Sequence, residues 1–130
     1  MNPIIDKILE YVDKERSRGT KIVRRSYGSL DGCEKCFMHC VTCYSNNKNI
    51  PPWQHEINRI LGTQFSGRWY LGFFAECNPQ DMDNLESYHS KQRSDEIRNM
   101  LQTEDAINGG AFAKELIAEY LSRGGIFEDA

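Results

Sequence analysis

Four of the five cysteines of this chain lie close together, and they are the residues with the clearest capacity for chemistry. They are Cys33, Cys36, Cys40 and Cys43. Thiols at this density bind a metal ion, carry out redox chemistry or pack into a hydrophobic core. We therefore take these four residues as the candidate metal site, with zinc as the candidate cofactor.

The spacing of the cysteines also limits how they could bind zinc. On one helix they would share an arc of about 80°, which is typical of a stripe of residues facing the core. Residues 33 and 43 would then lie about 15 Å apart, whereas the ligands of one zinc lie within about 4 Å of one another. Zinc binding would need a break in the helix, remote ligands such as Cys77, His55 or His89, or two ions, one for Cys33 and Cys36 and one for Cys40 and Cys43. Core packing, zinc binding and thiol redox chemistry all stay open.

A basic stretch precedes the cysteines. It consists of Lys14, Arg16, Arg18, Lys21, Arg24 and Arg25. Arginine forks bind phosphate and carboxylate groups, so these are the candidate residues for binding a nucleic acid or a protein. The same cations could instead complement the C-terminus of a helix and protect an edge strand from pairing.

The elements that must position these residues are mostly helical. Asn2 and Pro3 are typical of a helix start, and apolar residues at helical spacing predict an amphipathic helix over residues 3–18. Residues 20–27 predict a short strand. The cysteine segment predicts a second helix, and residues 52–61 predict a third.

The most strand-like segment is residues 68–76, which is apolar on both faces and rich in aromatic residues. We expect a central strand that is covered on both sides. From Pro79 onward the pattern is helical, and residues 108–110 (Asn-Gly-Gly) are expected to separate the last helix, residues 111–122, from the one before. Residues 128–130 are expected to fray.

These elements predict an α+β fold, with about five helices around a small antiparallel sheet of two or three strands. The chain has 130 residues, of which 39% are hydrophobic and 27% charged, so residues 1–130 are expected to form a helix-rich single globular domain. Two strands alone make a poor sheet. Either the chain contains a third strand that these patterns do not reveal, or a partner completes the sheet, for example a second copy of the chain in a homodimer.

Charge and hydropathy narrow the setting of the protein. The formal net charge of −3 gives no overall attraction to nucleic acid or to an anionic membrane. No apolar run approaches the roughly 18 residues that span a bilayer, and the N-terminal Asp6, Glu10 and Asp13 argue against a secretory signal. We predict a cytoplasmic, reducing location, no membrane partner, and cysteines that are thiols or ligands.

The sequence contains no glycine-rich phosphate loop and no nucleophile elbow. We therefore predict a small intracellular, non-catalytic binding or regulatory protein, of the accessory or inhibitor type, that contacts a macromolecule. In this hypothesis the cysteine cluster stabilises the fold. One alternative is a nucleic-acid-binding module that uses the stretch Lys14–Arg25, and a second is a thiol- or metal-dependent enzyme.

Overall fold

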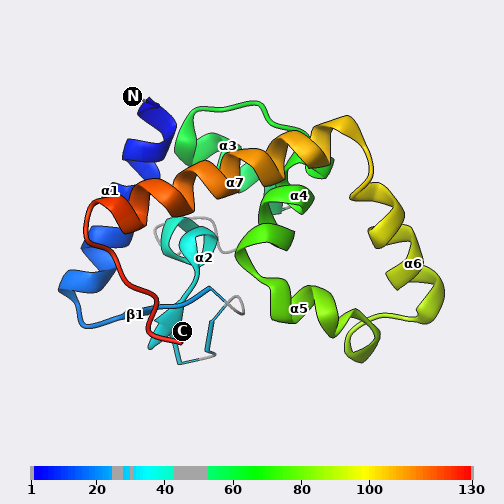
Figure 1. The fold of residues 1–130 in the computed structure, drawn as a ribbon, viewed down its shortest axis with the longest axis horizontal. Helices are drawn as coiled ribbons and strands as arrows, with labels where there is room; N and C mark the ends of the chain where they lie inside the picture. The colour runs from blue at the N-terminus through cyan, green and yellow to red at the C-terminus, as the bar shows by residue number, and fades with distance from the viewer. Residues whose placement is uncertain (1, 25–27, 30, 43–52, 130) are drawn as a thin grey trace.

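The computed structural model describes residues 2–24, 28–29, 31–42 and 53–129. In chain order, the elements are α1 (Pro3–Ser17), β1 (Lys21–Ile22), β2 (Glu34–Lys35), α2 (Phe37–Thr42), α3 (Trp53–Leu61), α4 (Gly67–Cys77), α5 (Pro79–Asp83), the 3-10 helix η1 (Leu85–Ser87), α6 (Lys91–Met100) and α7 (Glu104–Ser122). Figure 1 shows α7 running across the molecule, from the end of α6 to α1.

The expected antiparallel sheet of two or three strands is wrong. β1 and β2 are two residues each and pair in parallel, with Lys21 opposite Glu34 and Ile22 opposite Lys35. The rest of the described chain adds only an isolated antiparallel bridge between Gly28 and Lys35. So short a sheet cannot organise a core by itself, because sheet stability needs several paired strands. Helices form most of the core instead.

The expected central strand at residues 68–76 is also wrong, because this segment is the helix α4. The hydroxyl oxygen of Ser66 accepts a hydrogen bond from the backbone N–H of Trp69 at 3.1 Å, which caps the start of the helix. A helix that is apolar all round is stable when neighbours cover it. Trp69, Tyr70 and Phe73 are buried, so packing outweighs the strand preference of aromatic residues.

The predicted helix break at residues 108–110 is wrong as well, since α7 runs through it. α4 and α7 make the most extensive contact between two elements of the described chain. A β-carbon on Gly72 would overlap the backbone carbonyl oxygen of Ala106, and one on Gly109 would overlap that of Trp69. The glycines therefore let the two helix backbones touch, which outweighs the cost of glycine inside a helix.

The first helix forms as its sequence predicts. The Asn2 side-chain oxygen accepts a hydrogen bond from the Ile4 backbone N–H at 3.0 Å, and the helix ends at Ser17. Ile5, Ile8 and other apolar residues of this helix are buried in the main core. The α2 helix packs against α1 and supplies more of that core.

The C-terminal residues dock onto the fold, so the expected fraying is wrong for residues 128 and 129. The Glu128 backbone N–H donates to the carbonyl oxygen of Ile22 at 2.8 Å, beside β1. The Asp129 carboxylate accepts a hydrogen bond from the Arg24 backbone N–H at 3.1 Å. The ring of Phe127 packs against Phe37, with 5.5 Å between ring centroids.

Between α4 and α7 the chain makes an excursion through α5, η1 and α6, which we call the arm (residues 79–103). Figure 1 shows that α6 stands apart from α4, at the edge of the molecule. Both nitrogens of the Arg98 fork donate to the Glu86 carboxylate, at 2.6 and 2.9 Å, and so join α6 to η1. None of the helices in the described ranges is long and apolar enough to cross a bilayer.

Candidate functional site

The structure does not place the clustered cysteines on one helix. Cys33 is exposed ahead of β2, Cys36 lies between β2 and α2, and Cys40 lies within α2. Cys43 is outside the described residues. The predicted continuous helix across the cluster is therefore wrong, because α2 begins only at Phe37.

Cys36 is a buried thiol at the start of α2. The backbone N–H groups of Met38 and His39 and the side chain of Asn78 form hydrogen bonds with it that favour its charged form. Complete burial outweighs these bonds and raises the pKa of the Cys36 thiol to about 11. At neutral pH this thiol is protonated, whereas a nucleophilic cysteine reacts as a thiolate.

The other described cysteines divide between core and surface. Cys40 and Cys77 are buried in the main core. Burial and the neighbouring Cys36 raise the pKa of the Cys77 thiol well above its ordinary value. At the surface, the Asp31 carboxylate raises the pKa of Cys33 through a hydrogen bond and its negative charge.

The zinc prediction stays untested, since Cys43 is outside the described ranges. Among the side chains that the structure describes, no three His, Cys, Asp or Glu residues gather into a group that could hold a metal ion. His55 lies exposed on α3, and His89 lies exposed after η1. The structure thus does not join either histidine to the described cysteines.

The basic stretch wraps around the end of α1 and makes contacts within the molecule. The Lys14 ammonium lies 5.3 Å from the centroid of the Tyr11 ring, and the Arg16 guanidinium lies 6.0 Å from that of Tyr120. Lys14 and Arg16, two of the predicted binding residues, therefore make cation–π contacts within the protein. Lys21 is exposed on β1.

Ion pairs engage two more of these cations. An Arg18 Nη1 atom lies 3.9 Å from the Glu15 carboxylate, and an Arg24 Nη2 atom lies 3.4 Å from that of Glu76. Arg25 is outside the described residues. Four of the six predicted binding residues therefore make contacts within the protein, and their role in binding a partner stays a prediction.

Glu15 has a role that the sequence did not reveal. It is buried, and its carboxylate lies 3.0 Å from the Nζ atom of Lys35, which is also buried. The hydroxyl group of Thr20 donates to the second carboxylate oxygen at 2.9 Å. This pair joins the end of α1 to β2. The sequence shows Glu15 only as an acidic residue among the basic residues of the stretch Lys14–Arg25 and does not indicate that it is buried.

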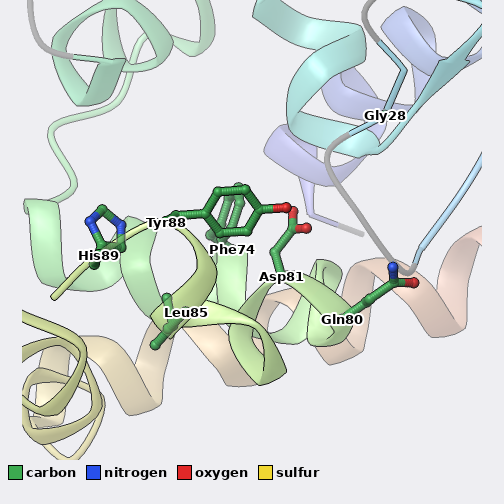
Figure 2. Close-up of a pocket in the computed structure, with 7 residues that line it drawn as sticks. All are labelled: Gly28, Phe74, Gln80, Asp81, Leu85, Tyr88 and His89. Carbon is green, nitrogen blue, oxygen red and sulfur yellow. The ribbon is translucent and has the colours of Figure 1, made fainter. Parts of the chain in front are cut away.

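The first surface hollow lies beside α5 and η1, with a volume of about 530 Å³. Its lining residues are Gly28, Phe74, Gln80, Asp81, Leu85, Tyr88 and His89. Figure 2 shows the Tyr88 ring extending across this hollow, with its hydroxyl end toward Asp81 and the Phe74 ring behind it. The wall thus combines aromatic surface with polar side chains.

A second hollow, of about 660 Å³, lies between α4 and α6. Its lining residues are Ser66, Gly67, Arg68, Leu71, His89, Arg93, Ile97, Met100 and Asp105. His89 lines both hollows. We call the combined surface of the two hollows along α4 the α4 groove. It is defined by Arg68, Leu71, Phe74, Tyr88, His89, Arg93, Ile97 and Met100.

Sequence reasoning missed the α4 groove because it took residues 68–76 for a strand. On a strand, Leu71 would face away from Arg68 and Phe74, since side chains alternate. On a helix, the three residues follow at intervals of three and share one face. The signal that could have found this face is the Ser66 cap, followed by apolar residues at helical spacing.

The α4 groove offers apolar contact area and charged groups. His89 is exposed and lines both hollows. Comparisons with protein-family models, curated proteins and solved structures find no match for this chain.

Proposed function

We propose that this protein is a small non-catalytic binding protein, of the accessory or inhibitor type, that contacts a partner protein through the α4 groove. The observation that carries this proposal is the meeting of two surface hollows at His89, along one face of α4. Concave surface with an apolar floor and polar edges is typical of sites that bind partners.

The side chains of the α4 groove support this role. Leu71 and Met100 are partly exposed and Ile97 is buried, so the floor is aliphatic. Tyr88 is 70% exposed, which leaves most of its aromatic surface uncovered. Tyrosine is enriched among the residues that dominate binding energy at protein interfaces. A partner that covers Tyr88 would remove this apolar area from water.

The state of the thiols supports binding over thiol chemistry. A reactive cysteine has a lowered pKa and access to solvent. Cys36 and Cys77 are buried with raised pKa values, and the exposed Cys33 also has a raised pKa. None of these three thiols has the lowered pKa and the access to solvent of a reactive nucleophile.

The contacts of the basic stretch do not favour the nucleic-acid alternative. Arg16 and Arg24 contact groups of the protein itself, and their neighbours divide between helix and strand. That alternative stays a prediction. We also infer a reducing, cytoplasmic location, because the described cysteines are free thiols and three of them are buried.

Selection of a random peptide library against the full-length chain would test the binding role. We expect the selected peptides to bind the Tyr88→Ala variant at least about tenfold more weakly, which corresponds to about 1.4 kcal/mol. Fluorescence anisotropy with labelled peptides measures the affinity. The Leu71→Glu variant should weaken binding as well, because it places a charge on the apolar floor.

Leu121→Ala is the matched control. Leu121 is 50% exposed on α7 and lines neither hollow, so its loss should leave peptide affinity unchanged. A library that yields no binder, or binders equally sensitive to both alanine variants, would show that the α4 groove is not the binding surface.

A further inference from the structure

We infer that the α4 groove takes an acidic amphipathic peptide segment, whose carboxylates meet Arg68 and Arg93 and whose apolar side chains cover Leu71, Ile97 and Met100. This inference rests on the proposed function, because it names the chemistry of the partner at the same surface. Its basis is the second hollow, whose described lining residues come from α4, α6 and the segments beside them.

The charge of this hollow is opposite to that of the whole chain. Arg68 and Arg93 line it, and among the described lining residues Asp105 is the one carboxylate. The Asp105 carboxylate already accepts a hydrogen bond from the Ser66 hydroxyl at 2.9 Å. The chain as a whole has a formal net charge of −3, so the hollow is a local basic site on an acidic protein.

The two arginines differ in whether their side chains already make an ion pair within the protein. Arg93 makes an ion pair with Glu96 of the same helix at 3.1 Å, and both side chains are about half exposed. Arg68 is exposed, and its side chain makes no ion pair or hydrogen bond with another residue of the described chain. Arg68 is therefore the group best placed to meet a carboxylate from a partner.

The floor between the arginines favours a peptide over a nucleic acid. Leu71, Ile97 and Met100 are aliphatic, whereas surfaces that bind single strands offer aromatic rings on which bases stack. An apolar groove between two helices is typical of sites that take the apolar face of an amphipathic helix. Methionine adapts its shape to different apolar side chains, so Met100 suits a bound peptide.

Contacts within the arm hold α6, which forms one wall of this hollow. Ile97 is a buried residue of α6, and the fork of Arg98 binds the Glu86 carboxylate on the side of η1. The hydroxyl group of Ser94 donates to the Ser90 carbonyl oxygen at 2.9 Å, within the first turn of the helix. The Arg98–Glu86 ion pair thus joins α6 to η1 before any partner binds, which reduces the entropy lost on binding.

Three labelled peptides of equal length, titrated into the full-length chain, would test this inference. The first is an amphipathic helix with leucines on one face and glutamates elsewhere. The second has lysines in place of the glutamates, and the third has serines in place of the leucines. We expect the first to bind at least tenfold more tightly than the other two by fluorescence anisotropy, with affinity that falls as salt rises.

Two variants with the same change in net charge identify the site. Arg68→Glu should weaken binding of the acidic peptide at least tenfold, because it places a carboxylate against the ligand. Lys114→Glu, on an exposed position of α7 outside both hollows, should change the affinity less than twofold. Circular dichroism checks that both variants fold, and Arg93→Gln gives a second, milder test.

The outcomes separate this inference from the proposed function. Library peptides that depend on Tyr88 but carry no acidic residues would overturn the acidic partner and leave the binding function standing. Equal binding of the glutamate and lysine peptides would overturn the inference too. Sedimentation that shows a dimer lost in Leu71→Glu would mean that a second copy of the chain occupies the groove, which also overturns it.

Discussion

Burial is the main cause of the raised pKa of two described cysteines, Cys36 and Cys77. Cys36 sits at the start of α2, where hydrogen-bond donors would normally favour a thiolate. The cost of burying a charge is larger than the gain from these donors, so its pKa rises. Position at a helix start is therefore not sufficient to make this cysteine reactive.

Alkylation rates should follow this division between buried and exposed thiols. We expect iodoacetamide to modify Cys33 at least about 100-fold faster than Cys36 or Cys77, because a buried thiol reacts only when the structure opens. Peptide mass spectrometry after timed quenching measures each rate. In urea the rates should become equal, and equal rates in the native protein would contradict the burial of Cys36.

Asp31 should slow the reaction of Cys33. The carboxylate raises the pKa of this thiol, so Asp31→Asn should lower that pKa and speed alkylation at pH 7.5. The same variant should leave the rate at Cys36 unchanged, which provides the internal control. A Cys33 rate that does not respond to the substitution would show that the two side chains do not interact in solution.

The raised pKa of Cys36 also predicts how stability depends on pH. The folded thiol ionises at about 11, whereas a thiol in the unfolded chain ionises near 9. Its contribution is therefore complete below pH 9 and is lost as pH rises from 9 to 11, by up to about 3 kcal/mol. Urea unfolding at pH 8 and pH 10.5 measures this loss, and Cys36→Ala should make it smaller.

At the scale of elements, the contact between α4 and α7 restricts which residues can stand at its closest points. Alanine normally stabilises a helix relative to glycine. At Gly72 and Gly109 a β-carbon would overlap a backbone carbonyl oxygen of the facing helix, which cannot move without separating the helices. Tertiary contact thus reverses the local preference at these two positions.

Substitution of these glycines should show the reversal. We expect Gly72→Ala and Gly109→Ala each to lower the free energy of unfolding by about 2–4 kcal/mol, because the helices must move apart. Gly110→Ala is the matched control, since its β-carbon would lie 3.6 Å from the Gly72 carbonyl oxygen, an ordinary contact. The control should be neutral or stabilise by up to about 1 kcal/mol in urea unfolding.

The arm should respond to acid through the ion pair between Glu86 and Arg98. The hydrogen bonds from Arg98 lower the pKa of Glu86 to about 2. A lowered pKa stabilises the folded arm above pH 4.5, and this contribution is lost as pH falls from 4.5 toward 2. The protection factors of the α6 amides, which remove the intrinsic pH dependence of exchange, should fall over that range, whereas those of α7 should stay unchanged.

Arg98→Gln tests the same ion pair at neutral pH. It should return the Glu86 pKa to its ordinary range in an NMR titration and speed amide exchange in α6. Lys91→Gln is the control, because Lys91 pairs with Asp95 of the same helix and its charge is the smallest contribution to the lowered pKa of Glu86. Exchange in α6 that is unchanged in Arg98→Gln would show that other contacts hold the arm.

At the scale of the whole molecule, the C-terminal tail packs against the N-terminal half of the fold. The Tyr120 hydroxyl donates to the carbonyl oxygen of Ile126, which directs the tail back along α7. Phe127 then packs between Phe37 and Tyr120, with centroid distances of 5.5 and 5.0 Å. Residues from opposite ends of the chain are therefore part of one core.

Removal of the Phe127 ring should destabilise the whole protein. We expect Phe127→Ala to lower the free energy of unfolding by about 1–3 kcal/mol, because two aromatic contacts and buried area are lost. Glu128→Ala should change it by less than about 0.5 kcal/mol, since that exposed residue binds Ile22 through its backbone N–H. Loss of stability that is equal in both variants would contradict the docked tail.

The sequence by itself determined the elements whose signals are local. Asn2, Pro3 and apolar residues at helical spacing were sufficient to place α1, and the same spacing placed α3 over Trp53–Leu61. Gly62, with a φ of 71°, ends that helix as a glycine does. Caps and periodicity act between near neighbours in the chain, so they can be recognised without the fold.

Only the tertiary structure decided the identity of α4, the course of α7 and the place of the candidate site. An apolar segment with both faces covered fits a central strand and a buried helix equally well, and the choice depends on what packs around it. Gly109 and Gly110 predict a helix break when only the sequence is known, whereas in the fold they lie against the backbone of α4 at Trp69 and Gly72. The α4 groove likewise depends on where the arm places α6, because its residues come from elements that local sequence signals cannot bring together.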